Sequence, residues 1–307
     1  MHHHDCENHH HEHESSKYES ALALYETHLS DEAVRQETER IIATNLPQND
    51  TRQAKEFLLS CLDLTSLHTE DTEESTLRLI ERINRFNDEF EDLEHVAAVC
   101  LYPSMIHLAS QSLEADDVAI AAVSAGFPHS QTFPEVKMAE TALCLKDGAT
   151  EIDIVLNVGK FLSGDYEAVC DEIEEQKALC GEKPLKVILE TGALRTARQI
   201  KRAAILALYA GADFIKTSTG KQQPAATPEA ALVMCSTLRE YYEKTGRKAG
   251  FKAAGGLNSV RDALTYYTIV KEVLGEEWLS PAYFRLGTSR LANLLLSDIT
   301  GTETHYF

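Results

Sequence analysis

Three ionisable side chains stand inside apolar stretches of this sequence. Lys216 lies in ADFIKTSTGK, Lys252 in GFKAAGG and Asp153 in EIDIVLN. A lysine with an ordinary pKa of about 10.4 is protonated at neutral pH and cannot attack a carbonyl. A second ammonium nearby disfavours the charged form and, together with partial burial, can supply a free amine. These residue types therefore predict amine catalysis, in which an imine activates the adjacent carbon and an aspartate with bound water moves protons.

Each of these side chains also has a structural explanation when it is taken alone. A lysine at a strand end can extend its ammonium into solvent over an apolar wall, and Asp153 could pair with a lysine for structural reasons only. Gathering all three in one place is costly because charged groups lose hydration, and clustered, perturbed charges tend to mark functional sites. We therefore expect one site with Lys216 as nucleophile. Lys252 would lower its pKa and exchange protons, and Asp153 would transfer protons.

The elements that must position these residues begin after residue 55. Short apolar runs there alternate with longer amphipathic segments, which predicts βαβ units and a parallel sheet. Eight strands with helices between them in about 250 residues favour an α/β fold, a (β/α)₈ TIM barrel, over an open doubly wound sheet. The active site of such a barrel forms at the carboxyl ends of its strands. The expected strands are 61–67, 96–103, 118–128, 151–158, 185–191, 212–219, 249–256 and 283–289.

Local signals mark the ends of several helices between the strands. Thr227 and Pro228 suit the cap and the first position of a helix. Ser259 with Asp262 three residues later predicts a capping box, and Gly211 is a suitable end for a helix over 196–210.

Glycines stand at the carboxyl ends of the last three expected strands. Gly220 follows the sixth, Gly255 and Gly256 follow Lys252 at the end of the seventh, and Gly287 lies in the GTS that ends the eighth. Glycine is common in turns for its backbone freedom alone, but barrels often bind phosphate through backbone N–H groups of the loops after strands 7 and 8. The coincidence predicts a phosphate site, with Lys221 as a countercharge.

Composition excludes several classes of partner. A net charge of −20 argues against a nucleic-acid binder, which needs a clustered basic face. No apolar run approaches the roughly 20 residues that span a bilayer, and the N-terminus lacks the pattern of a signal peptide. Seven scattered cysteines without a CxxC pair suggest neither a disulfide framework nor a zinc site. We therefore expect a soluble, cytoplasmic protein without a membrane partner.

The chain divides into four expected regions. Residues 1–16 form a His-rich tail that we expect to be disordered, and it could bind metal, be a native tail or be a remnant of cloning. Apolar residues recur at helical spacing in 17–55, which predicts a peripheral helical extension. Residues 56–300 are expected to form the barrel, and 301–307 a flexible C-terminal tail.

The sequence resembles the deoxyribose-phosphate aldolases, a class I aldolase family of (β/α)₈ barrels, from about Leu58 to Leu295. The resemblance implies reversible cleavage of 2-deoxy-D-ribose 5-phosphate to D-glyceraldehyde 3-phosphate and acetaldehyde. It implies a lysine Schiff base, no metal or other cofactor, and a role in deoxyribose phosphate catabolism, in a homo-oligomer (dimer or tetramer). The stretches that carry it are LDLTSL, VCLYP, AGFPHSQT, ATEIDIVLNVG, LKVILETGAL, AGADFIKTSTGK, TPEAA, GFKAAGG and RLGTS.

The motifs of this family also assign residues. Lys216 matches the Schiff-base lysine, Lys252 the second lysine and Asp153 the proton-transferring aspartate. Cys100, which the family places near the reacting end of the substrate, could equally be a small core residue. The substrate contacts that the resemblance implies are Asp63, Cys100, Thr219, Gly220, Lys221, Gly255, Gly256, Gly287 and Ser289.

This chain departs from the family pattern in four places. Ser289 is followed by Arg290 where many relatives have a second serine, so Arg290 either adds a cation to the phosphate site or points away. Ser130 replaces a loop glycine in FPHS. Tyr306, one position before the end, is the candidate for the tail tyrosine that assists proton transfer in relatives. The N-terminal extension has no counterpart that we can place.

Two other functions remain compatible with these residues. One is another Schiff-base barrel aldolase, of the transaldolase-like or fructose-bisphosphate type. The other is a non-catalytic sugar-phosphate binder, which would leave Lys252 and Asp153 without a role.

Overall fold

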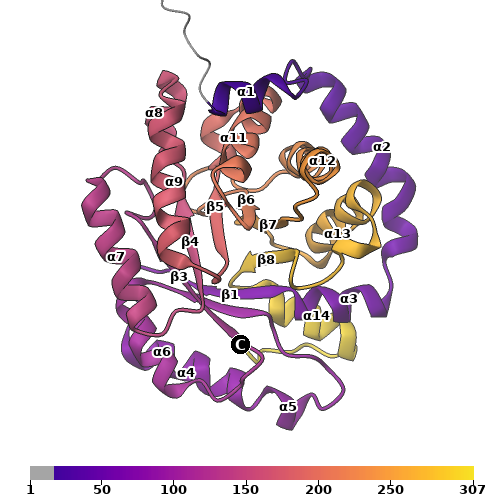
Figure 1. Cartoon of the computed structure of the whole chain (residues 1–307). Helices are drawn as coiled ribbons and strands as arrows, with labels where there is room; N and C mark the ends of the chain where they lie inside the picture. Colours follow the sequence, from indigo (N-terminus) through magenta and orange to yellow (C-terminus); the bar gives the residue numbers. More distant parts are fainter. Residues whose placement is uncertain (1–16) are drawn as a thin grey trace, which may run out of the picture.

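Eight parallel strands close into a barrel in the order in which they occur in the sequence (Figure 1). The structure, a computed structural model, describes residues 17–307, so the predicted His-rich tail lies outside the described residues. β8 pairs with β1 and thereby closes the sheet, which confirms the expected (β/α)₈ barrel. The strands are β1 (Leu62–Ser66), β2 (Ala98–Leu101), β3 (Ala119–Ser124), β4 (Glu151–Val155), β5 (Leu185–Ile188), β6 (Phe214–Lys216), β7 (Gly250–Ala254) and β8 (Phe284–Thr288).

The strands are buried on both sides, but the two sides differ in chemistry. In β4, Ile152 and Ile154 belong to the large apolar core that the strands share with the surrounding helices. Asp153 alternates with them and therefore faces the barrel interior. Val123 is its register partner on β3 and belongs to a separate, small apolar cluster with Cys100. The interior thus holds small apolar residues from β2 and β3 beside charged residues from other strands.

Helices surround the barrel, and the signals read from the sequence mark the starts of α12 and α13 correctly, whereas α11 ends at Tyr209 with Ala210, not Gly211, as its C-cap. Thr227 caps α12 by accepting a hydrogen bond from the Ala230 N–H. Ser259 and Asp262 form both bonds of the capping box at α13. The helices are α4 (Glu73–Asn84), α5 (Phe86–Glu89), α6 (Ile106–Ser112), α7 (Pro134–Lys146), α8 (Val158–Ser163), α9 (Tyr166–Cys180), α10 (Thr191–Leu194), α11 (Ala197–Tyr209), α12 (Pro228–Thr245), α13 (Val260–Leu274) and α14 (Leu291–Thr300), with short 3₁₀ turns at Pro103–Met105 and Glu276–Trp278.

The N-terminal extension is helical, as expected. It comprises α1 (Lys17–Ala23) and α2 (Asp31–Asn49) and is followed by α3 (Arg52–Ser60), which runs through the predicted boundary at residue 55 and leads directly into β1. α2 packs along the outside of α12 and α13 (Figure 1). Asn49 donates a 3.1 Å hydrogen bond to the Thr268 hydroxyl, and Asp31 accepts one of 2.7 Å from the Ala197 N–H. The extension is therefore fastened to the barrel at both ends of α2.

The C-terminal tail packs against the outside of the barrel, although the sequence predicted a flexible segment. The Asn293 side chain accepts hydrogen bonds from the N–H groups of Tyr306 and Phe307, both 2.9 Å, and donates one to the Phe307 carbonyl. The Tyr306 hydroxyl donates to the Arg82 carbonyl at 2.7 Å, and its ring contacts Phe90 edge to face. Tyr306 is therefore held on α4 and does not line the candidate cavity described below, because aromatic packing and these bonds engage it elsewhere.

None of the helices in residues 17–307 combines the length and the apolar character that crossing a bilayer requires.

Candidate active site

Lys216, Lys252 and Asp153 meet inside the barrel. Lys216 is the last residue of β6, and Lys252 is its register partner on β7, so the two side chains leave the sheet in the same direction. Their ammonium nitrogens lie 2.7 and 2.8 Å from the same oxygen, Oδ2 of Asp153 on β4. All three residues are at most 3% exposed. The structure thus brings these predicted residues together, and their catalytic roles remain predictions.

The surroundings of the two lysines shift their pKa values in opposite directions. Burial is the largest effect on Lys216 and lowers its pKa. Asp153 acts in the opposite direction, and the charge of Lys252 lowers the pKa further. The net result is a pKa below the ordinary value. Burial also disfavours the charge on Lys252, but Asp153 and Asp63 outweigh this and raise the pKa of Lys252. Lys216 is therefore the amine that releases its proton more readily, and Lys252 is the one that stays charged.

Asp153 remains a carboxylate despite complete burial. Burial alone would raise its pKa, but Lys186, Lys216 and Lys252 together hold the pKa well below the ordinary value. A buried carboxylate needs such partners, because an unpaired buried charge is strongly disfavoured. Asp153 is thus an ionised acceptor in contact with both candidate catalytic lysines.

Three further charged residues in the barrel interior were missed by the sequence reasoning. Lys186 on β5 lies opposite Asp153 in the strand register and donates to its Oδ1 at 2.8 Å. Lys186 also donates to Glu151 at 2.6 Å, and Arg285 on β8 donates to Glu151 at 2.8 Å. Lys186 and Arg285 carried the signal that revealed Asp153, a charge inside an apolar strand. Glu151 lies two positions before Asp153 and so on the same face.

Asp63 and Cys100 were predicted as substrate contacts, but they lie below the candidate cavity and do not line it. Asp63 is fully buried on β1, where its carboxylate accepts from Lys252 and, at 2.7 Å, from Arg285. Cys100 is fully buried in the interior apolar cluster, and burial raises the pKa of its thiol. Both residues stand inside their strands, so side chains from neighbouring strands cover them.

The predicted phosphate residues surround a cavity of about 340 Å³ at the carboxyl ends of β1, β6, β7 and β8. The cavity opens directly over Lys216, which is one of its lining residues. Arg290, for which the sequence left two alternatives, is also one of its lining residues. His68 and Asn258 are lining residues that the sequence reasoning did not select. The predicted residues that line it are Thr219, Gly220, Lys221, Gly255, Gly256, Gly287 and Ser289.

Glycine is required where two of these loops touch. Gly220 and Gly255 both have a φ of +77°, a conformation that side chains with a Cβ rarely adopt. A Cβ on Gly255 would lie 3.0 Å from the Gly220 Cα and 2.9 Å from the Ala225 Cβ. The absence of side chains therefore lets the loops after β6 and β7 approach each other at the edge of the cavity.

Glu190 holds Thr219, in the loop after β6, in place. Its carboxylate accepts bonds from the Thr219 hydroxyl at 2.6 Å and from the Thr219 N–H at 3.2 Å. Glu190 itself has a φ of +55°, which is unusual for a residue with a Cβ. Backbone strain of this kind persists where the surroundings hold it in place, often at functional sites.

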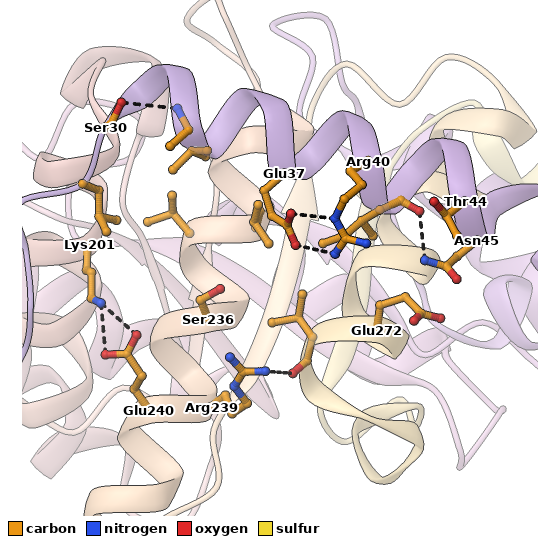
Figure 2. A pocket seen from close by; sticks show the side chains of 17 residues that line it. Ser30, Glu37, Arg40, Thr44, Asn45, Lys201, Ser236, Arg239, Glu240 and Glu272 are labelled. Atoms are coloured by element: carbon orange, nitrogen blue, oxygen red, sulfur yellow. Dashed lines mark hydrogen bonds and ion pairs between the residues drawn. The ribbon is translucent and has the colours of Figure 1, made fainter.

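A larger cavity lies away from these residues, beneath α2. Its volume is about 630 Å³, and its walls come from α2 and from α11, α12 and α13 (Figure 2). Four of its charged side chains form two ion pairs, Lys201 with Glu240 and Arg40 with Glu37, and Arg239 donates to the Val273 carbonyl. This cavity is remote from the clustered lysines, so its size alone does not make it the candidate site.

Comparison with known proteins agrees with this geometry. Residues 57–271 match a protein family described as DeoC/LacD family aldolase. The chain is 41% identical to the deoxyribose-phosphate aldolase of Homo sapiens over 256 residues, with 80% of this chain and 79% of the relative covered. It is 39% identical to that of Bos taurus over 259 residues, with 81% and 80% covered. A solved tetrameric deoxyribose phosphate aldolase from Aeropyrum pernix is 28% identical and superposes with a TM-score of 0.63, covering 82% of this chain and 96% of that one. On the strength of the match across the barrel, this chain belongs to the DeoC/LacD family of aldolases.

Proposed function

We propose that this aldolase cleaves 2-deoxy-D-ribose 5-phosphate reversibly into acetaldehyde and D-glyceraldehyde 3-phosphate. The observation that carries the proposal is the pair of lysines on one carboxylate beneath a glycine-lined cavity. The names and the identity of the relatives from Homo sapiens and Bos taurus support the choice of substrate. The reaction belongs to deoxyribose phosphate catabolism.

Lys216 supplies the nucleophile in the proposed mechanism. Its neutral amine attacks C1 of the open-chain aldehyde, and loss of water gives an iminium ion. The iminium draws the electron pair of the C2–C3 bond onto C2 while the C3 hydroxyl loses its proton, so glyceraldehyde 3-phosphate leaves. The remaining enamine takes a proton at C2, and water then hydrolyses the imine to acetaldehyde and the free amine.

Asp153 and Lys252 are the proposed proton carriers. Asp153 is ionised and touches both lysines, so it can pass protons, through bound water, between the substrate oxygens and Lys252. The permanent charge on Lys252 keeps Lys216 in its reactive, neutral form. The roles of the two lysines therefore follow from their different surroundings on neighbouring strands.

The backbone of the late loops is the proposed phosphate site. Gly220, Gly255, Gly256 and Gly287 leave room for an anion beside backbone N–H groups, and Lys221 and Arg290 line the same cavity with cations. Because this site is next to Lys216, a substrate phosphate there would place C1 near the amine.

We also propose a cytoplasmic homo-oligomer. The tetrameric relative from Aeropyrum pernix supports oligomer formation, and a substrate and product that are free sugar phosphates suit the cytoplasm.

Reductive trapping tests nucleophile, donor size and reaction class together. Borohydride added with 2-deoxy-D-ribose 5-phosphate or acetaldehyde is expected to leave a two-carbon adduct on the peptide that contains Lys216, detected by peptide mass mapping. Ketose phosphates should give no adduct; trapping of a ketose phosphate would instead favour a transaldolase-like or fructose-bisphosphate-type enzyme. Substrate binding without acetaldehyde release would favour a non-catalytic binder.

Crowding the two phosphate loops should weaken binding of the phosphorylated substrate selectively. Gly255→Ala adds a Cβ against Gly220 and is expected to raise KM for 2-deoxy-D-ribose 5-phosphate by about tenfold, equivalent to about 1.4 kcal/mol. Activity on unphosphorylated 2-deoxyribose should change little, because that sugar has no phosphate to place.

Gly246→Ala is the matched control for this prediction. Gly246 ends α12 with a φ of +71°, so alanine meets a similar backbone strain, but no atom lies within 4 Å of the added Cβ. Equal increases of KM for the phosphorylated and the unphosphorylated sugar in Gly255→Ala would contradict a phosphate site in these loops.

A further inference from the structure

Six charged side chains form a closed ring of ion pairs inside the barrel, below the cavity. Asp153 accepts from Lys186 at 2.8 Å, and Lys186 also donates to Glu151 at 2.6 Å. Glu151 accepts from Arg285 at 2.8 Å. Arg285 donates to Asp63 at 2.7 Å, and Lys252 closes the ring by donating to Asp63 and, at 2.8 Å, to Asp153. We call this set, Asp63, Glu151, Asp153, Lys186, Lys252 and Arg285, the ion-pair ring.

The charges of the ion-pair ring cancel. It contains three carboxylates and three cations, and every member's side chain is at most 8% exposed. Lys216 is outside this balance, because it adds a fourth basic group that shares Asp153 Oδ2 with Lys252. An uncompensated charge at this depth is strongly disfavoured, since the low-dielectric interior cannot solvate it. One of the four bases is thus left without a carboxylate of its own.

We infer that Glu151, Lys186 and Arg285 are positioning residues for the aldolase reaction: they complete a neutral ion-pair ring and so leave Lys216 as the base without a proton. This inference rests on the proposed function. It extends the influence on Lys216 beyond Lys252 to residues that touch neither Lys216 nor the cavity over it.

The direction of the pKa changes agrees with this charge count. The pKa values of Lys186, Lys252 and Arg285 are raised, because for each of them carboxylates outweigh the cost of burial. The pKa of Lys216 alone among these four bases is lowered, with burial as the largest cause. The three cations of the ring therefore stay protonated, and Lys216 is the base that gives up its proton.

Other groups near Lys216 do not alter this balance of charges. Cys100 from β2 faces the same interior, and burial raises the pKa of its thiol, which keeps it neutral. His68, Lys221 and Arg290 line the cavity above Lys216 from loops at the barrel mouth. A bound phosphate would meet the cations of Lys221 and Arg290, and all three residues are the same in every variant considered next.

Opposite changes of ring charge should move the pH dependence of imine formation in opposite directions. The rate rises with pH as Lys216 loses its proton. Lys186→Met leaves the ring with an excess negative charge, which stabilises protonated Lys216 and moves this rise to higher pH by about one unit or more. Glu151→Gln leaves an excess positive charge, which moves the rise to lower pH. The measurement is the single-turnover rate of borohydride trapping with acetaldehyde across the pH range.

Two further variants separate electrostatic from structural effects. The double variant Glu151→Gln with Lys186→Met restores a neutral ring, and its pH profile should return to that of the wild type even if its thermal stability is low. Lys201→Met removes a buried lysine that pairs with Glu240 outside the barrel, and it should not move the profile. Should a single variant fail to fold, the remaining single variant and the double variant still give the sign of the effect.

Several outcomes overturn the inference. Rates that fall in both single variants at an unchanged pH midpoint would mean that the ring is only structural. A double variant that keeps the displacement of one single variant would contradict charge balance. Absence of trapping in the wild type would instead refute the proposed function, so failure of the two proposals can be told apart.

Discussion

Replacing Lys216 with alanine is expected to abolish cleavage of 2-deoxy-D-ribose 5-phosphate, with a loss in kcat on the order of 10⁶-fold, the scale on which loss of a covalent nucleophile acts. Among the described residues, Lys221 is the other lysine that lines the cavity, and its ammonium donates to the Leu67 carbonyl. The measurement is acetaldehyde release together with reductive trapping, and both should vanish.

The fold of this variant should survive. Asp153 keeps Lys186 and Lys252 as partners, so no buried carboxylate is left unpaired. A melting temperature close to that of the wild type is the expected result. Lys201→Ala is the control: it removes an equally buried lysine, leaves Glu240 without its partner, and should lower stability while trapping persists. Residual turnover in Lys216→Ala at more than a trace would exclude the Schiff-base assignment.

Lys252→Leu is expected to slow imine formation at neutral pH without removing the nucleophile. Loss of this buried ammonium raises the pKa of Lys216, so a smaller fraction of the amine is free. The acidic limb of the pH profile should move up by about 1 to 3 pH units. The rate at neutral pH should fall by roughly 10- to 10³-fold, and a higher pH should recover part of it. Pre-steady-state trapping at several pH values measures both quantities.

Lys252→Arg preserves the charge and provides the comparison for this experiment. It should keep the midpoint of the pH profile near that of the wild type even if a poorer fit to Asp63 and Asp153 lowers the maximal rate. A full rate at neutral pH in Lys252→Leu would show that the charge of Lys252 does not control Lys216. Any influence of the ion-pair ring on the pKa of Lys216 would then have to come from members other than Lys252.

The residues that the sequence reasoning found have one property in common: local context made them unusual. Lys216, Lys252 and Asp153 interrupt apolar strands, and glycines cluster where strands end. The same rule applied to every strand would also have selected Lys186 and Arg285, because each stands between two apolar neighbours. Both residues lie near the starts of their strands, away from the carboxyl ends where the active site of a barrel is expected.

Other features could not be read from local context. Glu190 acts through Thr219, 29 positions away, and only the packing of the loops after β5 and β6 brings them together. Tyr306 was a candidate for the site on its position near the end of the chain. Its contacts with Arg82 and Phe90 depend on where α4 and α5 lie relative to α14, which no sequence pattern indicates.

The sequence by itself determined the alternation of strands and helices, the barrel class, the N-terminal ends of α12 and α13, and which strands carry the candidate catalytic lysines. These follow from periodicity and capping, which act over a few neighbouring residues. Only the tertiary structure decided which carboxylate each cation contacts, and therefore which lysine keeps its proton. That choice depends on charges from six different strands meeting in a low-dielectric interior, where differences of an ångström in distance outweigh any local preference.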